Sequence, residues 1–186
     1  IPDIVHHFFT TVFRGIEKYA NAKGYNVIVC VSDESFDKEV INMEMLANGS
    51  IDGFIMALSA ETQKRKDFNH LREVTEQGIP LVLFDRVTDE VPCDKVLIDD
   101  KAAAREAVRR LIGSGRKRIA LFTTETYLNV SAHREEGYRA ALREAGIPVE
   151  ESLVLRLPYQ FEEEALSERF FREQRFDAVL CVNEIF

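Results

Sequence analysis

The chain has 186 residues, 46% of them hydrophobic and 30% charged, a composition typical of a globular protein that buries a substantial core. Its formal net charge of −8 repels phosphate backbones, so we expect this part of the protein not to bind DNA or RNA directly. No apolar run approaches the roughly 20 residues that a membrane-spanning helix requires.

Short β-branched runs alternate along the chain with longer segments of helical periodicity. The first half predicts, in order, a helix over 8–23 that ends at Gly24, a strand over 27–31, a helix containing Phe36, Val40, Met43 and Ala47, a strand over 54–58, a helix containing Phe68, Leu71 and Val74, and a strand over 81–84. The second half predicts a strand over 95–99, a helix containing Ala104, Ala107, Val108, Leu111 and Ile112, then a strand over 119–122, a helix over 132–145, a strand over 153–157, a helix over 162–173 and a strand over 178–182. Continuous apolar strands that alternate with helices predict an α/β fold with parallel sheets covered on both faces.

The tripeptide Gly-Ile-Pro occurs twice, at 78–80 and at 146–148, each time after a predicted helix. Glycine closes a helix and proline prevents it from restarting, which is common punctuation in α/β proteins. The repetition also suggests two similar lobes, with the change from one lobe to the next near residues 99–101. Residues 1–3 resemble the tail of a strand and residues 183–186 the start of a helix, so we expect the sequence to be a fragment of a longer protein.

The three cysteines are Cys30, Cys93 and Cys181. Cys30 and Cys181 lie within apolar runs and are predicted to be buried, whereas Cys93 is predicted to be a loop thiol. Their odd number and wide spacing fit neither a disulfide framework nor a zinc site, which favours a reducing, cytoplasmic compartment.

Polar residues follow most of the predicted strands, and in open α/β sheets ligands bind at the carboxyl ends of the strands. These residues are Ser32-Asp33, Ser59, Asp85-Arg86, Thr123-Thr124 and Asn183-Glu184. Many of them simply end a strand, but the adjacent Asp85 and Arg86 offer the acceptors and donors that suit a polyhydroxylated ligand. Phe8 lies off the apolar stripe that contains Phe9, so it is a candidate for stacking on a flat ligand face.

Motifs typical of enzymes are absent from the sequence. The adjacent His6 and His7 cannot share one helical face, and no G-x-S-x-G, P-loop or G-x-G-x-x-G occurs. The acid pairs Asp33-Glu34 and Asp99-Asp100 occur in a chain with 32 acidic residues, and we interpret them as solvated surface. We therefore expect no catalytic role, no metal site and no cofactor.

An ordered set of segments resembles the effector domain of the LacI/GalR family of bacterial transcription regulators. IPDIVHHFFTTVFRGIEKYANAKGYNVIVCVSDE is similar to the family pattern V-P-D-I-x-N-P-F-F, a helix, G-Y, a strand and S-D. The similarity continues through IDGFIMA, GIPLVLFDR, VLIDDKAAAREAVRRLIGSGRKRIALF, HREEGYRAALREAGI and FDAVLCVNE.

The resemblance implies two Rossmann-like lobes of the type I periplasmic-binding-protein-like fold. Residues 1–98 would form the N-terminal lobe, and residues 102–186 part of the C-terminal lobe. The first strand and the last part of the C-terminal lobe would be missing. The DNA-binding helix-turn-helix, which precedes the effector domain in this family, would be absent from this chain.

The resemblance also implies a set of effector-binding residues, with Arg134 as the main polar clamp and Asn183 as a donor. The full set is His6, Phe8, Phe9, Asp85, Arg86, Arg134, Tyr159, Phe161 and Asn183, where Tyr159 or Phe161 would close the pocket and spacing slightly favours Tyr159. His6 and His7 replace the usual Asn and Pro. Because imidazole cannot donate and accept in the geometry of an amide, this departure weakens the case for a common pentose.

The implied function is allosteric control of DNA binding by a sugar-like ligand held between the lobes of a cytoplasmic homodimer without membrane contact. DNA would be contacted only through the missing N-terminal domain. A periplasmic sugar-binding protein of an ABC transporter is the alternative, and a secretory signal instead of a helix-turn-helix at the full-length N-terminus would favour it. A structural module that senses nothing is a third possibility, which the set of implied ligand residues Asp85, Arg86, Arg134 and Asn183 argues against.

Overall fold

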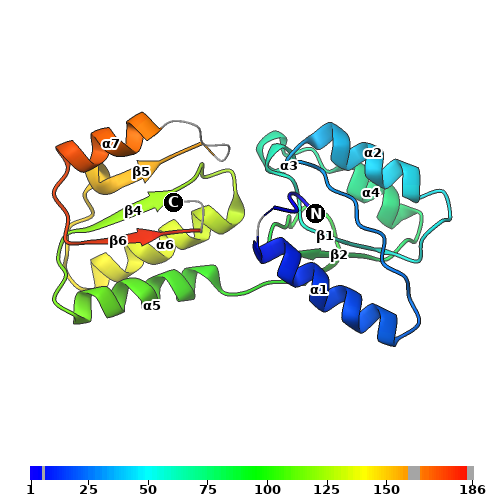
Figure 1. The fold of residues 1–186 in the computed structure, drawn as a ribbon, viewed down its shortest axis with the longest axis horizontal. Helices are drawn as coiled ribbons and strands as arrows, with labels where there is room; N and C mark the ends of the chain where they lie inside the picture. The colour runs from blue at the N-terminus through cyan, green and yellow to red at the C-terminus, as the bar shows by residue number, and fades with distance from the viewer. Residues whose placement is uncertain (6, 159–163, 184–186) are drawn as a thin grey trace. The chain divides into compact units, whose positions relative to one another are not determined.

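The computed structural model describes residues 1–5, 7–158 and 164–183, and the chain divides into two compact units, Ile1–Leu97 and Ile98–Phe186 (Figure 1). Each unit contains a three-stranded parallel sheet with helices on both faces, which confirms the predicted α/β class with parallel sheets.

The sheet of the first unit has the strand order β1-β2-β3, with Phe54 opposite Leu81 and Val82 opposite Asp94. β2 is central, so its LVLF run is apolar on both faces, as expected of a strand covered from both sides. The elements of this unit are α1 (His7–Ala22), α2 (Phe36–Leu46), β1 (Phe54–Met56), α3 (Ala60–Arg65), α4 (Asn69–Glu76), β2 (Leu81–Phe84) and β3 (Asp94–Val96).

Two apolar clusters enclose this sheet. Met43 of α2 and Leu71 and Val74 of α4 pack on one face together with Leu83 of β2, whereas Phe9 of α1 packs against Phe84 on the other face. The helical periodicity of the sequence therefore predicted correctly that these four helix side chains turn toward the sheet, but not for Tyr19, which has the same spacing in α1 and is exposed.

Besides shifts of up to three residues in the ends of β1 and β3, the first unit departs from the predicted elements in two places. Residues 27–31 do not form a strand. Among the described residues, the backbone bonds near the end of this segment are to Ile1, whose amino group donates to the Cys30 carbonyl at 2.8 Å and whose carbonyl accepts from the Ser32 N–H at 3.0 Å. The short helix α3 was not predicted, because six residues contain no helical apolar repeat. Its local signal is Ser59, which caps the helix by accepting a bond from the Thr62 N–H at 3.1 Å.

The second unit has the strand order β5-β4-β6, and all five residues of the central β4 are buried. Leu121 lies opposite Val154 on one side and opposite Leu180 on the other. The elements of this unit are α5 (Asp100–Gly113), β4 (Ile119–Thr123), α6 (Asn129–Glu144), the short 3-10 helix η1 (Glu151–Leu153), β5 (Val154–Arg156), α7 (Glu164–Glu173) and β6 (Ala178–Cys181).

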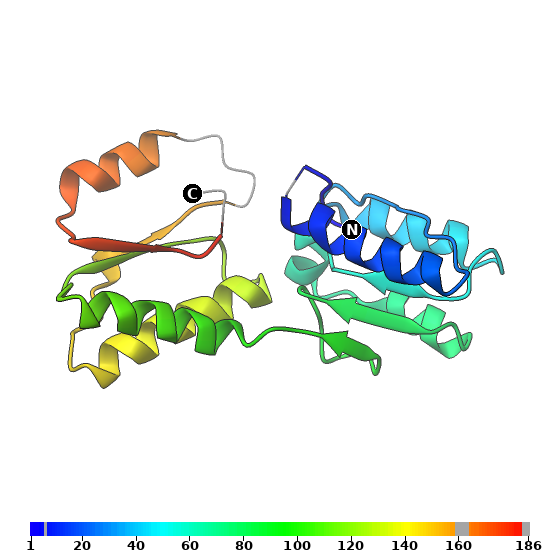
Figure 2. The same cartoon turned by 60° about the horizontal axis from the view of Figure 1, so that its bottom comes forward.

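Helices α5 and α6 run side by side on one face of this sheet, and α7 covers the other face (Figure 2). The closest approach is at Gly137 of α6: a Cβ atom there would lie 3.0 Å from the Ala104 Cβ and would clash with the Lys101 carbonyl oxygen. The absence of a side chain at this position thus allows the two helix backbones to meet.

The repeated Gly-Ile-Pro tripeptide has the same role in both units. Gly78 (φ 78°) follows α4 and Gly146 (φ 67°) follows α6, both in the left-handed conformation that terminates a helix. In each case the next residue's N–H bonds back to the helix, Ile79 to Val74 and Ile147 to Leu142.

The cysteines depart in part from their predicted burial. Cys30 and Cys93 are half-buried, whereas Cys181, predicted to be buried, is exposed. The reason is that β6 forms an edge of the described sheet and its side chains alternate between more and less accessible positions. Among the described residues, none of the helices has the length and apolar character needed to cross a bilayer.

Tyr138 anchors α6 to the sheet, since its fully buried hydroxyl donates to the Ile119 carbonyl at 2.8 Å and burial raises its pKa to about 12. Tyr138→Phe should cost about 1–2 kcal/mol at neutral pH, because the buried carbonyl loses its donor. The raised pKa stabilises the folded state fully below the ordinary pKa near 10, and this contribution is lost as pH rises through about 12.

The stability difference between the wild-type and Tyr138→Phe should therefore shrink over this pH range in urea titrations. Tyr19→Phe is the control, because Tyr19 is exposed. A difference that stays constant from pH 10 to 12 would contradict the assignment of the shift to Tyr138.

Candidate functional site

In the first unit, the predicted residues Asp85 and Arg86 follow β2 directly. The Arg86 side chain is buried, and its Nη1 lies 2.8 and 2.7 Å from the two carboxylate oxygens of Glu34. Its guanidinium carbon also lies over the ring of Phe9, 5.5 Å from the centroid. The polar end of β2 thus contains a buried ion pair whose guanidinium is covered by the ring of Phe9.

The two predicted phenylalanines differ in burial. Phe9 is buried and contacts Phe84 edge-on, with 6.3 Å between ring centroids. Phe8 is 44% exposed and lies edge-on to Phe9 at 5.2 Å. The structure therefore brings Phe8, Phe9 and Arg86 together at the carboxyl end of β2.

The backbone that supports this ion pair is left-handed at three residues other than glycine: Asp33 (φ 51°), Glu34 (φ 59°) and Asp85 (φ 56°). Such residues are uncommon and tend to occur where the surrounding structure determines their conformation. Here Glu34 is fixed by its Arg86 partner, by a 2.6 Å bond from the Ala60 N–H to Oε2 and by a 3.2 Å bond from its own N–H to the Pro2 carbonyl.

A second buried carboxylate, Glu39 of α2, lies beside the same loop. It accepts bonds from the Ser59 N–H at 2.6 Å and the Thr62 hydroxyl at 2.8 Å, and it contacts Nε2 of His70 at 2.9 Å. The other ring nitrogen of His70 has no partner among the described residues, and the ring lies edge-on to Phe36. Glu39 thereby ties α2, α3 and α4 together behind the Glu34–Arg86 pair.

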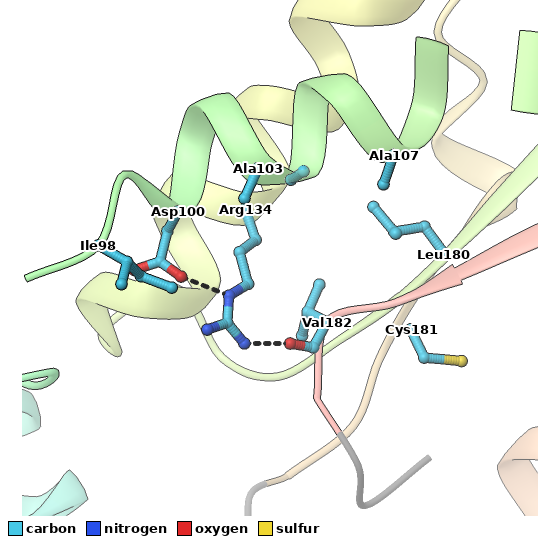
Figure 3. Close-up of a pocket in the computed structure, with 9 residues that line it drawn as sticks. Ile98, Asp100, Ala103, Ala107, Arg134, Leu180, Cys181 and Val182 are labelled. Carbon is cyan, nitrogen blue, oxygen red and sulfur yellow. Dashed lines mark hydrogen bonds and ion pairs between the residues drawn. The ribbon is translucent and has the colours of Figure 1, made fainter. Parts of the chain in front are cut away.

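In the second unit, the predicted clamp Arg134 projects from α6 toward the end of β6 (Figure 3). Its Nε donates to Asp100 at 2.7 Å and its Nη1 donates to the Val182 carbonyl. The Arg134 side chain is 27% exposed, whereas that of Asp100 is 4% exposed. Both line a pocket of about 220 Å³ whose other walls are largely aliphatic: Ile98, Ala103, Ala104, Ala107, Leu180, Cys181 and Val182.

Asp100 is the first residue of α5, where the helix dipole favours a negative charge. Asn183 follows Val182 and is half-buried. At the end of β4, the buried hydroxyls of Thr124 and Ser131 lie 2.5 Å apart. The carboxyl ends of β4 and β6 are therefore polar, and a fixed guanidinium is among their groups.

The interpretation of both acid pairs as solvated surface is wrong for one residue of each pair. Asp33 and Asp99 are exposed, but Glu34 and Asp100 are buried as partners of the two predicted arginines. The signal for Asp100 was its spacing, because it lies four and eight residues before Ala104 and Val108 on the buried stripe of α5. Glu34 had no comparable signal, since its partner is 52 residues away in the chain.

Three predicted site residues, His6, Tyr159 and Phe161, lie outside the described residues, as does Glu184. Within the described ranges, no group of His, Cys, Asp and Glu side chains is arranged to hold a metal ion.

The family model for periplasmic binding proteins and the sugar-binding domain of the LacI family matches residues 1–186. Catabolite control protein A of Priestia megaterium is 34% identical over 166 residues, which cover 87% of this chain and 48% of that protein. The chain spans about half the length of the curated relatives with which it aligns along most of its length.

Solved structures of two regulators are also similar. Transcription regulator CcpA of Lactococcus lactis is 29% identical with a TM-score of 0.82, and the match covers 96% of this chain and 65% of that one. A LacI family transcriptional regulator from Enterococcus faecium, solved with bound ribose, is 26% identical with a TM-score of 0.77, over 97% of this chain and 64% of that one.

Proposed function

The chain belongs to the family that comprises periplasmic binding proteins and the sugar-binding domain of LacI-type regulators, and from this we propose that it senses a small sugar-like effector for a bacterial transcription regulator. The observation that carries the proposal is the guanidinium of Arg134, which Asp100 and the Val182 carbonyl fix at the carboxyl end of β6. A fixed donor at a strand end is suited to hydroxyl groups of a ligand. The regulator of Enterococcus faecium that was solved with ribose supports a sugar as the class of ligand.

In this proposal, residues 1–98 act as the N-terminal lobe and residues 102–186 as part of the C-terminal lobe. The effector contacts Phe8, Phe9, Asp85 and Arg86 from the first lobe and Arg134 and Asn183 from the second, with His6 and Tyr159 or Phe161 completing the set. The protein acts as a cytoplasmic homodimer and catalyses no reaction. DNA is bound by a separate domain.

Regulation in this proposal is a population shift. The effector favours one arrangement of the lobes and so changes the spacing of the DNA-binding domains in the dimer. It can do so only to the extent that its affinity differs between the two arrangements.

A transcription regulator is favoured over the alternative of a periplasmic transport protein, because the similar curated proteins include several named as transcriptional regulators or repressors. Binding of the full-length protein to promoter DNA, with and without sugars, separates the two functions. A full-length protein that begins with a secretory signal and binds no DNA would contradict the regulator.

Arg134→Ala should remove most of the stabilisation that a cognate sugar gives. At about a hundredfold excess over Kd, the full-length protein should gain about 2.7 kcal/mol, measured as a rise in Tm. The variant should lose this gain because its strand end no longer carries the fixed guanidinium.

The matched control is Arg139→Ala, which also removes an ion-paired arginine from α6, one that contacts Glu135 and Glu151. This control should keep the sugar-dependent shift even if its basal Tm falls. If the sugar-dependent rise in Tm is undiminished in Arg134→Ala, the assignment of Arg134 to the site is wrong.

A further inference from the structure

Both arginines of the proposed site are already paired with a buried carboxylate. Arg86 contacts Glu34, and Arg134 contacts Asp100. The two pairs form independently within separate units, from different elements and over different sequence separations. The same arrangement of charge therefore occurs twice.

The Glu34–Arg86 pair lies in a low-dielectric environment, because both side chains are more than nine-tenths buried. Nη1 of Arg86 contacts both carboxylate oxygens, and Oε2 of Glu34 also accepts the Ala60 N–H. For an anion that approaches Arg86, the positive charge of the guanidinium is already balanced, because the Glu34 carboxylate lies within 3 Å of Nη1. It would lose its hydration without gaining an uncompensated cation.

The Asp100–Arg134 pair has the same balance of charge at a more accessible position. Contacts within the described residues use two of the five N–H donors of the Arg134 guanidinium, one on Asp100 and one on the Val182 carbonyl. A neutral hydroxyl can accept from a remaining donor and can itself donate to a carboxylate oxygen. A carboxylate or a fully deprotonated phosphate offers only acceptors, and the negative charge of either anion is repelled by the adjacent Asp100 carboxylate.

We infer that the effector is an uncharged polyhydroxylated molecule, and that Glu34 and Asp100 are specificity-determining residues that exclude phosphorylated or carboxylated analogues. This inference rests on the proposed function and names the ligand class for the same site. Exclusion by a fixed like charge is a general route to specificity, because it penalises the competitor without weakening the correct ligand.

The first test compares free sugars with their phosphate esters on the unaltered full-length protein. Ribose, glucose and fructose are each titrated beside the matching phosphate ester and beside inorganic phosphate, by calorimetry and by thermal shift. A free sugar that binds should do so at least about tenfold more tightly than its ester. Inorganic phosphate should give no shift.

The second test removes each compensating charge. Asp100→Asn and Glu34→Gln keep the size of the side chain but leave the arginine positive, so inorganic phosphate should now bind at least about tenfold more tightly than to the unaltered protein. Asp99→Asn and Asp33→Asn are the matched controls, because each removes one charge from the adjacent exposed residue and should leave phosphate binding unchanged. Circular dichroism checks that each variant is folded. If Glu34→Gln does not fold, the test rests on Asp100→Asn.

The outcomes separate the inference from the proposed function. Tighter binding of a phosphate ester than of its free sugar, or phosphate binding in the unaltered protein equal to that in Asp100→Asn, overturns the inference and leaves the sensor intact. Gain of phosphate binding in Asp99→Asn as large as in Asp100→Asn also overturns it, because the effect would be general. If no sugar and no ester binds, the proposed function falls together with the inference that rests on it.

Discussion

Gly137→Ala is expected to lower the free energy of unfolding by about 3 kcal/mol, although alanine favours helices more than glycine does. The added Cβ would lie 2.9 Å from the Arg105 amide nitrogen and even closer to the Lys101 carbonyl oxygen. Both neighbours are backbone atoms of α5, so they cannot move aside as a flexible side chain would. Helix α5 must shift away from α6, which loosens the buried stripe of Ala104 and Val108.

Gly15→Ala is the control, since the same substitution should change stability in the opposite direction there. Gly15 lies in the middle of α1 with open space around its Cβ position. Alanine should therefore stabilise the protein by about 0.5–1 kcal/mol through its helix propensity. Chemical denaturation of the two variants measures both changes, and equal stability of Gly137→Ala and the wild-type would refute the close approach of α5 and α6.

Glu39→Ala is expected to cost about 3–5 kcal/mol, the largest loss that we predict for a single substitution. The carboxylate accepts from the Ser59 N–H and the Thr62 hydroxyl and is in contact with His70. Its removal leaves these buried polar groups without their shared partner and opens a cavity between α2, α3 and α4. No water can reach the site easily, because Ser59 and Thr62 are completely buried.

Glu44→Ala serves as the control on the same helix, because Glu44 is exposed. It should change stability by less than about 0.5 kcal/mol. Urea denaturation compares the two variants, and hydrogen exchange of the Ser59 and Thr62 amides shows where Glu39→Ala acts. A loss below about 1 kcal/mol would mean that Glu39 does not hold these elements together.

Local patterns in the sequence predicted most of the fold. The run LVLF predicted β2 over the same four residues, and the apolar spacing of 8–23 predicted α1 to within one residue at each end. These predictions succeed for one reason: each element buries one face, and the spacing of its apolar residues along the sequence shows which face that is. The strand predicted over 27–31 is wrong, because an apolar run indicates burial but does not supply the neighbouring strand with which it must pair. Ile28 in this run is 60% exposed.

The candidate site was less predictable, because a charged side chain is buried only by a partner from elsewhere in the chain. Arg86 was singled out as a ligand-binding residue, but nothing near it in the sequence indicated that Glu34 would compensate it. Asp100 could have been found from the spacing of α5, yet its partner Arg134 lies on another helix. Arg86 was thus predicted from its place after a strand and Arg134 from the family resemblance, and their charge balance became visible only in three dimensions.

The left-handed backbone at Asp33 and Glu34 bears on which amino acids each position can accept over evolutionary time. Glycine adopts this conformation at lower cost than aspartate or glutamate, and asparagine at lower cost than glutamate, so mutation and selection for folding alone would favour these residues. At position 33 such a drift costs only an exposed ion pair with Lys38. At position 34 it would remove the counter-charge of the buried Arg86, so conservation of this ion pair would hold the position to a residue that its backbone disfavours.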